Sequence, residues 1–385
     1  MNLGVIGFGL RSYVMIEAMK KIDDSLKIKA ITDIRDLKPD LKKYKYSDEE
    51  IEKINFYSDV DDMLKSEKLD GILIGTRCSL HTAMALKVFP TGIPVFLEKP
   101  VATNIEDLQK LYAAVSEDEK LDDRVLVSFP LRFTPLVQFS KEIIDSGKIG
   151  KIEHVQAVNN VPYGRCYYHD WYRDQNETGG LFLQKATHDL DYLNYLLGYK
   201  PIKLCAMKSK QIFKGNKPAG LKCADCAEAD TCNESPINVK LNTGEDNDGD
   251  YCCFAVDTGN EDSGDVLVEY DTGMHLSYSQ NFFARKAAQK RGARLLGYYG
   301  TLEFDWYTSE INVYMHQTNR VENYKITPTS GHDGGDYALA LNFLNLINGK
   351  EKSKATLKEG ILSALMCLKA KESAETETFQ DIKLK

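Results

Sequence analysis

The sequence lacks a hydrophobic run long enough to cross a membrane. No segment approaches the roughly 18 consecutive apolar residues of a transmembrane helix. It also lacks the basic stretch that opens a signal peptide, because Met1 to Gly7 run directly into a strand-like segment. We therefore expect a cytoplasmic protein that does not associate with membranes.

An excess of basic side chains is missing as well. The 49 lysines and arginines are outnumbered by 57 aspartates and glutamates, and the resulting net charge of −8 argues against a nucleic-acid partner. The 9 cysteines are an odd number in a long chain. In a cytoplasmic protein they are expected to be thiols or metal ligands and not disulfides.

Length and periodicity predict two domains in the 385 residues. Up to about residue 125, short aliphatic runs alternate with helical patterns, as in a doubly wound parallel sheet. From about residue 150, strand-like runs joined by hairpin-type turns predominate. We predict a cofactor domain over 1–125 and an α/β domain with a large, mostly antiparallel open sheet over 126–385. A cysteine-containing excursion is expected at about 208–262.

A glycine-rich turn follows the first predicted strand. The run Gly7-Phe8-Gly9-Leu10-Arg11-Ser12 resembles a dinucleotide-binding fingerprint, in which glycines let the backbone approach a pyrophosphate at a helix N-terminus. Asp33 closes the second predicted strand, where the fingerprint has a carboxylate for the ribose hydroxyls. Together these residues predict a Rossmann domain that binds NAD, while the nearby Arg35 leaves NADP open.

A lysine stands at the end of another predicted strand, in the tripeptide Glu98-Lys99-Pro100. The carboxyl ends of parallel strands are where doubly wound sheets bind ligands, and an ammonium there can polarise a carbonyl or exchange a proton. Glu98 is expected to pair with Lys99 and hold it charged. Taken alone, the tripeptide is also compatible with an ordinary strand end followed by a turn.

Several motifs in this order resemble the Gfo/Idh/MocA family (glucose–fructose oxidoreductase, inositol dehydrogenase and rhizopine catabolism proteins). They are Gly7-Phe8-Gly9, Thr76 to His81, Glu98-Lys99-Pro100, Leu131 to Pro135, Asp145 to Gly150, and Gly179 to Gly198. The resemblance implies a Rossmann domain joined to an open-sheet domain that forms a homodimer or homotetramer. It also implies hydride transfer to or from a sugar, inositol or related polyol carbon with NAD or NADP.

The resemblance assigns site residues too, with Lys99 as the catalytic lysine and His188 at the substrate proton. The aspartate that the family usually has four residues earlier is Gln184 here, which cannot take a proton. Lys185 follows it and is expected to help Lys99 stabilise an alkoxide. Cofactor contacts are expected from Gly7, Phe8, Gly9, Leu10, Arg11, Asp33, Thr76, His81, Glu98 and Lys99.

Helical spacing adds expectations around His188. Gln184, His188 and Asp191 would share one helix face, and Lys185 and Asp189 would form an i, i+4 ion pair. Aromatic and basic side chains crowd residues 163–173, which suits a polyhydroxylated or anionic substrate but also a packed sheet edge. The predicted substrate contacts are Arg132, Tyr163, Arg165, His169, Gln184, Asp189 and His332.

Three cysteines of the excursion, Cys223, Cys226 and Cys232, are spaced as C-x2-C-x5-C, and Cys252 or Cys253 could supply a fourth thiolate. Four thiolates suit a structural zinc ion, which would hold the excursion together and take no part in catalysis. The alternatives are a redox or Fe–S role and a set of ordinary reduced thiols, since no second C-x-x-C accompanies the first.

Two other functions stay open beside an NAD(P)-dependent oxidoreductase. A redox-assisted enzyme that cleaves or epimerises glycosides would use the same transient oxidation to acidify a neighbouring carbon. A cofactor-binding sensor without turnover would account for Gln184, but it would need neither Lys99 nor His188. The presence of both residues favours the enzyme.

Overall fold

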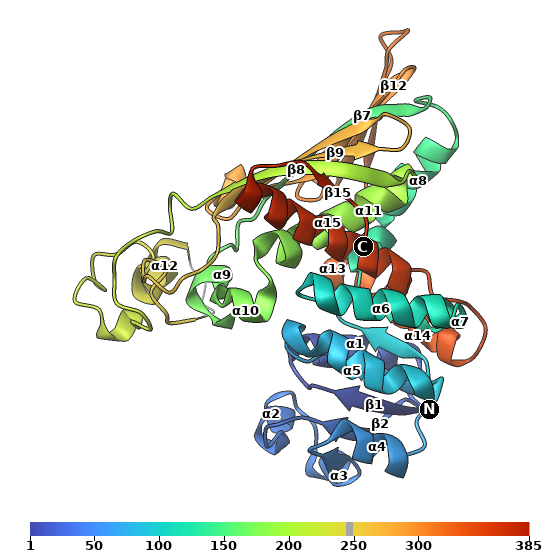
Figure 1. Cartoon of the computed structure of the whole chain (residues 1–385), viewed down its shortest axis with the longest axis vertical. Helices are drawn as coiled ribbons and strands as arrows, with labels where there is room; N and C mark the ends of the chain where they lie inside the picture. The colour runs from blue at the N-terminus through green and yellow to red at the C-terminus, as the bar shows by residue number, and fades with distance from the viewer. Residues whose placement is uncertain (244–248, 385) are drawn as a thin grey trace. The chain divides into compact units, whose positions relative to one another are not determined.

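The computed structural model describes residues 1–243 and 249–384, which form two compact units. The first unit comprises Met1–Val137, Pro328–Leu365 and Leu384. The second comprises Gln138–Thr327 and Met366–Lys383. The chain therefore returns to the first unit after residue 327, while the expected domain division near residue 125 stays a prediction. Figure 1 labels the elements of both units.

The first unit is built on a six-stranded parallel sheet. Its strands are β1 (Asn2–Ile6), β2 (Lys27–Thr32), β3 (Asn55–Tyr57), β4 (Gly71–Ile74), β5 (Val95–Leu97) and β6 (Val125–Val127). Their order, β3-β2-β1-β4-β5-β6, is that of a Rossmann fold, with β1 paired to both β2 and β4. Every residue of β4, β5 and β6 is buried, as in parallel strands covered on both faces. The predicted doubly wound sheet is confirmed.

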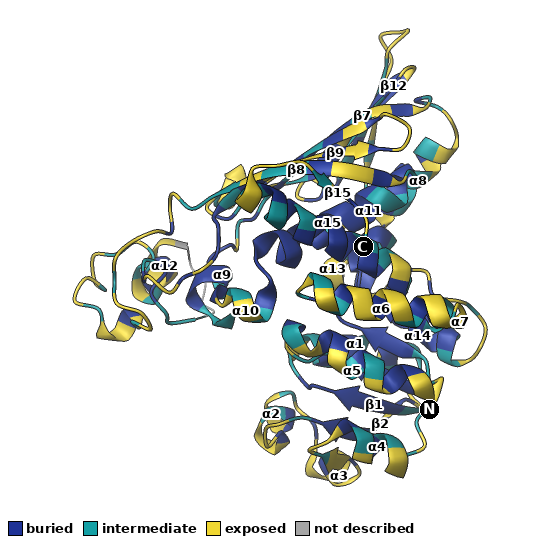
Figure 2. Ribbon diagram, viewed as in Figure 1, coloured by how far each residue is buried: buried dark blue, intermediate teal, exposed yellow. Residues whose placement is uncertain are grey.

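Helices cover this sheet and turn their exposed faces to solvent (Figure 2). They are α1 (Leu10–Ile22), α2 (Lys38–Lys43), α3 (Asp48–Glu52), α4 (Val60–Ser66), α5 (His81–Val88), α6 (Ile105–Glu117), α7 (Lys120–Arg124), α13 (Ser330–Asp333) and α14 (Gly335–Ile347). In α6, the buried residues Leu108, Leu111 and Val115 follow helical periodicity, and Asn104 caps the first turn. Phe343 anchors α14 to β5 through an edge contact with Phe96, with ring centres 5.6 Å apart.

The second unit is built on a nine-stranded sheet of order β14-β13-β12-β11-β7-β10-β9-β8-β15. The strands are β7 (Ile152–Asn160), β8 (Pro201–Ser209), β9 (Ser263–Tyr270), β10 (His275–Asn281), β11 (Lys290–Gly297), β12 (Gly300–Asp305), β13 (Glu310–Met315), β14 (Val321–Lys325) and β15 (Gln380–Asp381). β7 and β10 pair in parallel, and the other pairings of these strands are antiparallel. The predicted large, mostly antiparallel sheet is confirmed.

This second sheet has one covered and one open face. In β9, burial alternates from residue to residue, with Val266 and Val268 buried and Leu267 exposed. The covered face packs against α11 (Thr187–Leu197), where Tyr270 of β9 donates a hydrogen bond to Asn194 at 2.9 Å. The chain also forms α8 (Pro135–Asp145), α9 (Cys166–His169), α10 (Gln175–Thr178), α12 (Pro236–Thr243) and α15 (Leu357–Thr376). None of the helices in the described ranges is long and apolar enough to cross a membrane.

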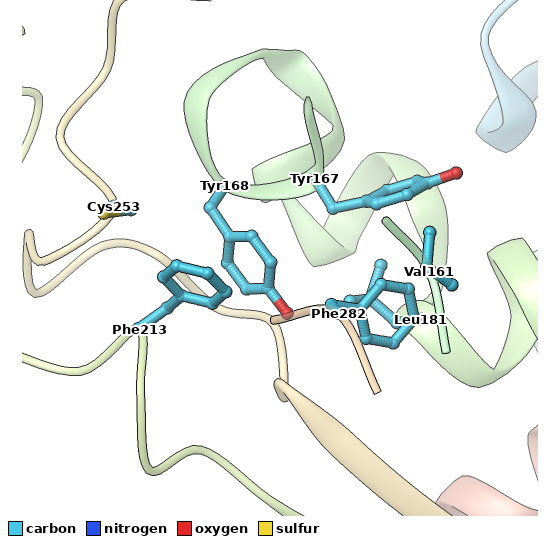
Figure 3. Packing of buried hydrophobic residues seen from close by; sticks show 7 residues of the cluster. All are labelled: Val161, Tyr167, Tyr168, Leu181, Phe213, Cys253 and Phe282. Atoms are coloured by element: carbon cyan, nitrogen blue, oxygen red, sulfur yellow. The ribbon is translucent and has the colours of Figure 1, made fainter. Parts of the chain in front are cut away.

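The predicted excursion corresponds to the connection between β8, which ends at Ser209, and β9, which begins at Ser263. Both ends of this connection are packed into the second unit. Phe213 and Cys253 join a buried cluster whose other members, drawn in Figure 3, are Val161, Tyr167, Tyr168, Leu181 and Phe282. Asp262 accepts hydrogen bonds from the backbone N–H groups of residues 211–213 at 2.5 to 3.0 Å. The connection is therefore held at its base and is not a free loop.

Candidate functional site

The glycine-rich turn lies at the carboxyl end of β1, where α1 begins. Gly7 has a φ of +80°, and a Cβ there would lie 2.7 Å from the Thr76 backbone, so only glycine fits. Gly9 precedes α1 without a side-chain capping bond, and nothing lies within 4 Å of where its Cβ would be. The uncapped start of this 13-residue helix suits the pyrophosphate of a dinucleotide.

Asp33 follows β2 and contacts this turn. Its carboxylate accepts hydrogen bonds from the Phe8 N–H at 3.0 Å and from Nε and Nη2 of Arg35, each at 3.0 Å. Partial burial alone would raise the pKa of Asp33, but the bonds from Arg35 and from Phe8 outweigh burial and lower it. The charged carboxylate and the Arg35 guanidinium therefore stand together where the fingerprint expects the adenosine ribose.

Glu98 and Lys99 lie directly after β5, and the Lys99–Pro100 peptide bond is cis. Glu98, which was expected to pair with Lys99, is buried and pairs with Arg11, whose Nε donates to it at 3.1 Å. Arg11 also contacts Asp336 at 2.6 Å. This network joins α1, the end of β5 and the start of α14. The guanidinium of Arg11 thus forms two ion pairs inside the first unit, and its expected contact with the cofactor stays a prediction.

His81 opens α5 and is buried, with 2% of its surface exposed. Its Nδ1 lies 2.7 Å from the Pro100 carbonyl oxygen, and its Nε2 lies 3.2 Å from the Thr76 carbonyl oxygen. Burial lowers the pKa of His81, so the ring is neutral and donates only one of these two bonds at a time. His81 therefore links the segment after Lys99 to the segment of Thr76, and direct cofactor contacts of His81 and Thr76 stay predictions.

In the second unit, the segment of Gln184, Lys185 and His188 begins with a π-helical turn, Phe182–Ala186, and continues as α11. The wider turn changes the α-helical spacing on which the expected Lys185–Asp189 ion pair rested. That expectation is wrong, because the fully buried Asp189 pairs with Arg291 of β11 at 2.7 Å. Gln184 is also buried and donates a hydrogen bond to the Thr178 carbonyl at 2.8 Å.

Three donors converge on Asp189. Asn159 of β7 donates at 2.7 Å, Tyr278 of β10 at 2.8 Å, and Nε of Arg291 at 2.8 Å. Burial opposes the charge on Arg291, but Asp189 outweighs this and raises the pKa of Arg291 above its usual value. Arg291 could not be found from sequence spacing, because it lies 102 residues from Asp189 and only the pairing of β11 with β7 brings it there.

Lys185 contacts aromatic side chains. It donates a hydrogen bond to the Tyr163 hydroxyl, and its ammonium lies 4.4 Å from the centre of the Tyr163 ring. The centre of the Tyr167 ring lies 5.6 Å from the same ammonium. Two predicted site residues, Tyr163 and Lys185, are therefore in direct contact, although they lie 22 positions apart in the chain.

Two predicted substrate contacts in the first unit have partners inside that unit. Arg132 is buried, and its guanidinium pairs with Glu359 at 2.8 Å and donates to the Lys354 carbonyl at 3.0 Å. His332 places Nδ1 at 2.9 Å from a carboxylate oxygen of Asp336. These partners favour structural roles, and contact of Arg132 or His332 with a substrate stays a prediction.

The aromatic and basic run at residues 163–173 is also partly internal. Arg165 is buried and pairs with Glu234 of the excursion at 2.7 Å. His169 is fully buried, with its Nε2 3.9 Å from the same carboxylate. Of the residues predicted in this run, Tyr163 keeps a large exposed surface, 47% of its total. Arg165 and His169 therefore fit the sheet-edge interpretation better than the substrate-wall interpretation.

The cysteines give no support to the predicted zinc ion. Cys223, Cys226, Cys232, Cys252 and Cys253 all lie in the described ranges, and within those ranges no group of three or more potential ligands is placed to hold a metal. Burial and neighbouring thiols raise the pKa of Cys223 to about 11. Burial also raises the pKa of Cys253.

Two family models match the chain. A model described as an oxidoreductase family with an NAD-binding Rossmann fold matches residues 1–125. A model of the GFO/IDH/MocA C-terminal domain matches residues 137–303. The two matches together cover well over half of the chain.

Named relatives agree with these matches. The putative oxidoreductase YteT of Bacillus subtilis is 27% identical over 250 residues, which are 58% of this chain and 58% of that protein. Myo-inositol 2-dehydrogenase of Thermotoga maritima is 28% identical over 198 residues, 51% of this chain and 55% of that protein. The chain thus spans little more than half the length of these relatives. A solved levoglucosan dehydrogenase in complex with NADH superimposes with a TM-score of 0.76 at 18% identity, covering 100% of both chains, and shows the same fold.

The Asp189–Arg291 pair predicts a large loss of stability when it is broken. Asp189→Asn would leave the Arg291 charge buried without a counter-charge, at a cost of about 3 to 5 kcal/mol in unfolding free energy. Urea denaturation measures this loss. Glu49→Gln is the matched control, because it breaks the exposed Glu49–Lys53 pair, and its urea midpoint should stay at the wild-type value. Equal midpoints for both variants would contradict the prediction.

Proposed function

Because the chain belongs to the Gfo/Idh/MocA oxidoreductase family, we propose that it transfers hydride between a nicotinamide cofactor and a sugar, inositol or related polyol carbon. The observation that carries the proposal is the Rossmann sheet with Gly7 and Gly9 after β1, Asp33 after β2 and Lys99 after β5. These are the strand ends at which doubly wound sheets bind ligands. A relative named myo-inositol 2-dehydrogenase supports the substrate class.

Each part of the first unit has a role in this proposal. When bound, the cofactor supplies the nicotinamide carbon that accepts or returns the hydride. Backbone N–H groups at the start of α1 bind its pyrophosphate, and Asp33 binds a ribose hydroxyl. Lys99 stabilises negative charge on the substrate oxygen, and His188 acts at the same hydroxyl. We assign both residues to one reacting carbon, with Lys185 adding positive charge.

The first test removes the charge of Lys99. Lys99→Met should lower kcat by roughly 10²- to 10⁴-fold, the usual scale for a charge-stabilising or proton-transfer group, and should leave NADH affinity nearly intact. His188→Asn should lower kcat as well. A panel of sugars, inositols and glycosides, followed by nicotinamide absorbance and product analysis, identifies the substrate. Lys110→Met, on the exposed surface of α6, is the control and should behave as the wild type.

The outcomes separate the candidate functions. Near-native turnover of Lys99→Met would contradict the role of that lysine. Release of an aglycone or an epimer would favour the redox-assisted reaction over simple dehydrogenation. A protein that binds NADH tightly and turns over no member of the panel would favour the sensor.

Cofactor choice rests on Asp33 and Arg35, and we infer a preference for NAD. Asp33→Ser removes the acceptor for the ribose hydroxyl and frees Arg35, so the affinity ratio of NAD to NADP should fall by roughly tenfold or more, the worth of one charge-assisted hydrogen bond. Arg35→Ser should move the ratio in the opposite direction, since the guanidinium favours a 2′-phosphate. Fluorescence titration with both reduced cofactors measures the ratio. An unchanged ratio in both variants would show that neither side chain faces the ribose.

We also infer that two copies associate through the open face of the nine-stranded sheet. Leu267 and Met207 are exposed by 52% and 77% on this face, and Cys205 lies beside Leu267 in the strand register. Exposed apolar side chains on a sheet face are typical of an interface. Leu267→Glu should shift the protein toward the monomer in light scattering, whereas Tyr112→Glu on the exposed surface of α6, which is not part of this sheet, should leave the mass unchanged. A monomeric wild type would contradict the inference.

A further inference from the structure

We propose that Tyr163 and Lys185 form the proton-transfer pair of the site, with the Tyr163 oxygen taking the proton of the substrate hydroxyl. This inference rests on the proposed hydride transfer and names the group that replaces the missing acid at Gln184. Tyr163 then carries the proton, and His188 is left to orient the same hydroxyl. Oxidation of a carbinol removes a hydride from carbon and a proton from oxygen. The substrate O–H bond would break and a new O–H bond would form on the Tyr163 phenolate, giving the neutral phenol, while a bound nicotinamide cofactor would accept the hydride. In the reverse direction, Tyr163 returns the proton to the carbonyl oxygen.

The first observation is the environment of Lys185. The residue is buried, with 6% of its surface exposed, yet no ion pair joins it to a carboxylate among the residues that the structure describes. Its contacts are the Tyr163 hydroxyl and the faces of the Tyr163 and Tyr167 rings. Asp189, the carboxylate nearest in sequence, is already bound by Arg291. A buried ammonium without a carboxylate stabilises negative charge on whatever oxygen it contacts, and that oxygen belongs to Tyr163.

The second observation is the acidity of the phenol. Burial of the hydroxyl on its own would raise the pKa of Tyr163. The positive charges of Lys185 and Arg291 and the hydrogen bond from Lys185 outweigh burial, so the pKa lies below its usual value. The titratable and charged groups around the hydroxyl are Lys185, Arg291, Cys166, Tyr167, Tyr307 and Asp189. A phenol poised in this way exchanges a proton closer to neutral pH than an ordinary tyrosine does.

The third observation is that the backbone next to both members of the pair is held in place. Gly164 packs so closely on the Phe282 carbonyl that a Cβ would lie 2.1 Å from it, which fixes the backbone next to Tyr163. Glu261 accepts hydrogen bonds from the N–H groups of Leu181 and Phe182, each at 3.1 Å, just before Lys185. Leu181 and Phe282 both belong to the buried cluster of Figure 3. A preorganised pair of this kind is what proton transfer requires.

Gln184 cannot be the proton carrier in place of Tyr163, because an amide does not take up a proton at neutral pH and its N–H group is already hydrogen-bonded. It is buried, with 1% of its surface exposed, and donates to the Thr178 carbonyl at 2.8 Å. Tyr163, in contrast, keeps 47% of its surface exposed. Of these two side chains, the tyrosine is the one that is partly open to solvent.

The first experiment needs neither substrate nor cofactor. Ultraviolet difference titration follows phenolate formation in the wild type, in Tyr163→Phe and in the matched control Tyr167→Phe. The wild type should show one phenolate that forms at lower pH than the rest of its 21 tyrosines. This phase should be absent in Tyr163→Phe and present in Tyr167→Phe, since burial raises the pKa of Tyr167 well above its usual value. An unchanged titration of Tyr163→Phe would overturn the proposal.

The second experiment measures turnover on the substrate found by the panel. Tyr163→Phe should lower kcat by roughly 10²-fold or more, with KM changed by less than about threefold, and should remove the limb of the oxidation profile that rises with pH. Lys185→Met should keep this limb but move it to higher pH, because the phenolate loses its cation. A merely structural role would lower kcat without moving the limb.

The two experiments distinguish a failure of the hydride-transfer proposal from a failure of the proposal for Tyr163. If no substrate is found but the early phenolate titrates as expected, the hydride-transfer proposal fails while the acidity of Tyr163 stands. If turnover is found and Tyr163→Phe retains the native kcat and pH profile, the hydride transfer stands and Tyr163 is excluded as the proton carrier.

Discussion

The second unit is organised around one buried carboxylate, Asp189. A charge with no access to water must be compensated within the protein, and here Arg291, Asn159 and Tyr278 do so from three different strands. α11 is therefore positioned on the sheet by directional bonds as well as by apolar packing. Because the Asp189 carboxylate is occupied by these three donors, Lys185 instead donates its hydrogen bond to the oxygen of Tyr163. The chemistry of that pair thus depends on an ion pair in which neither residue takes part.

The first unit uses the same principle with the charges reversed. A single guanidinium, Arg11, lies between two carboxylates, Glu98 and Asp336, which come from segments far apart in the chain. Together with the His81 ring, which lies between the carbonyls of Thr76 and Pro100, this network holds the residues on both sides of Lys99. In both units, residues that look like site residues in the sequence keep neighbouring residues in place.

The sequence predicts the architecture well because the architecture is encoded locally. Aliphatic runs such as Gly71–Ile74 and the alternation in Ser263–Tyr270 reflect buried and half-buried strands directly. Asn55–Tyr57 and Val321–Lys325 are short strands with no buried residue and no aliphatic run, so the sequence does not predict them. The interaction partners of the site residues are harder to predict from the sequence. Helical spacing suggests Lys185–Asp189, whereas the actual partners come from a π-helical turn and from a strand far away in the sequence.

The excursion between β8 and β9 also has a meaning for how the fold can change over evolution. Glu261 satisfies the N–H groups of Leu181 and Phe182, and Glu234 neutralises the buried Arg165. Each contact ties the excursion to a different segment of the sheet unit. An insertion of this kind is usually a separable module that a protein gains or loses at little cost. Here its loss would leave the N–H groups of Leu181 and Phe182 without their acceptor and the buried Arg165 without its counter-charge. The sequences of the excursion and of the helical segment that carries Lys185 can therefore change only together.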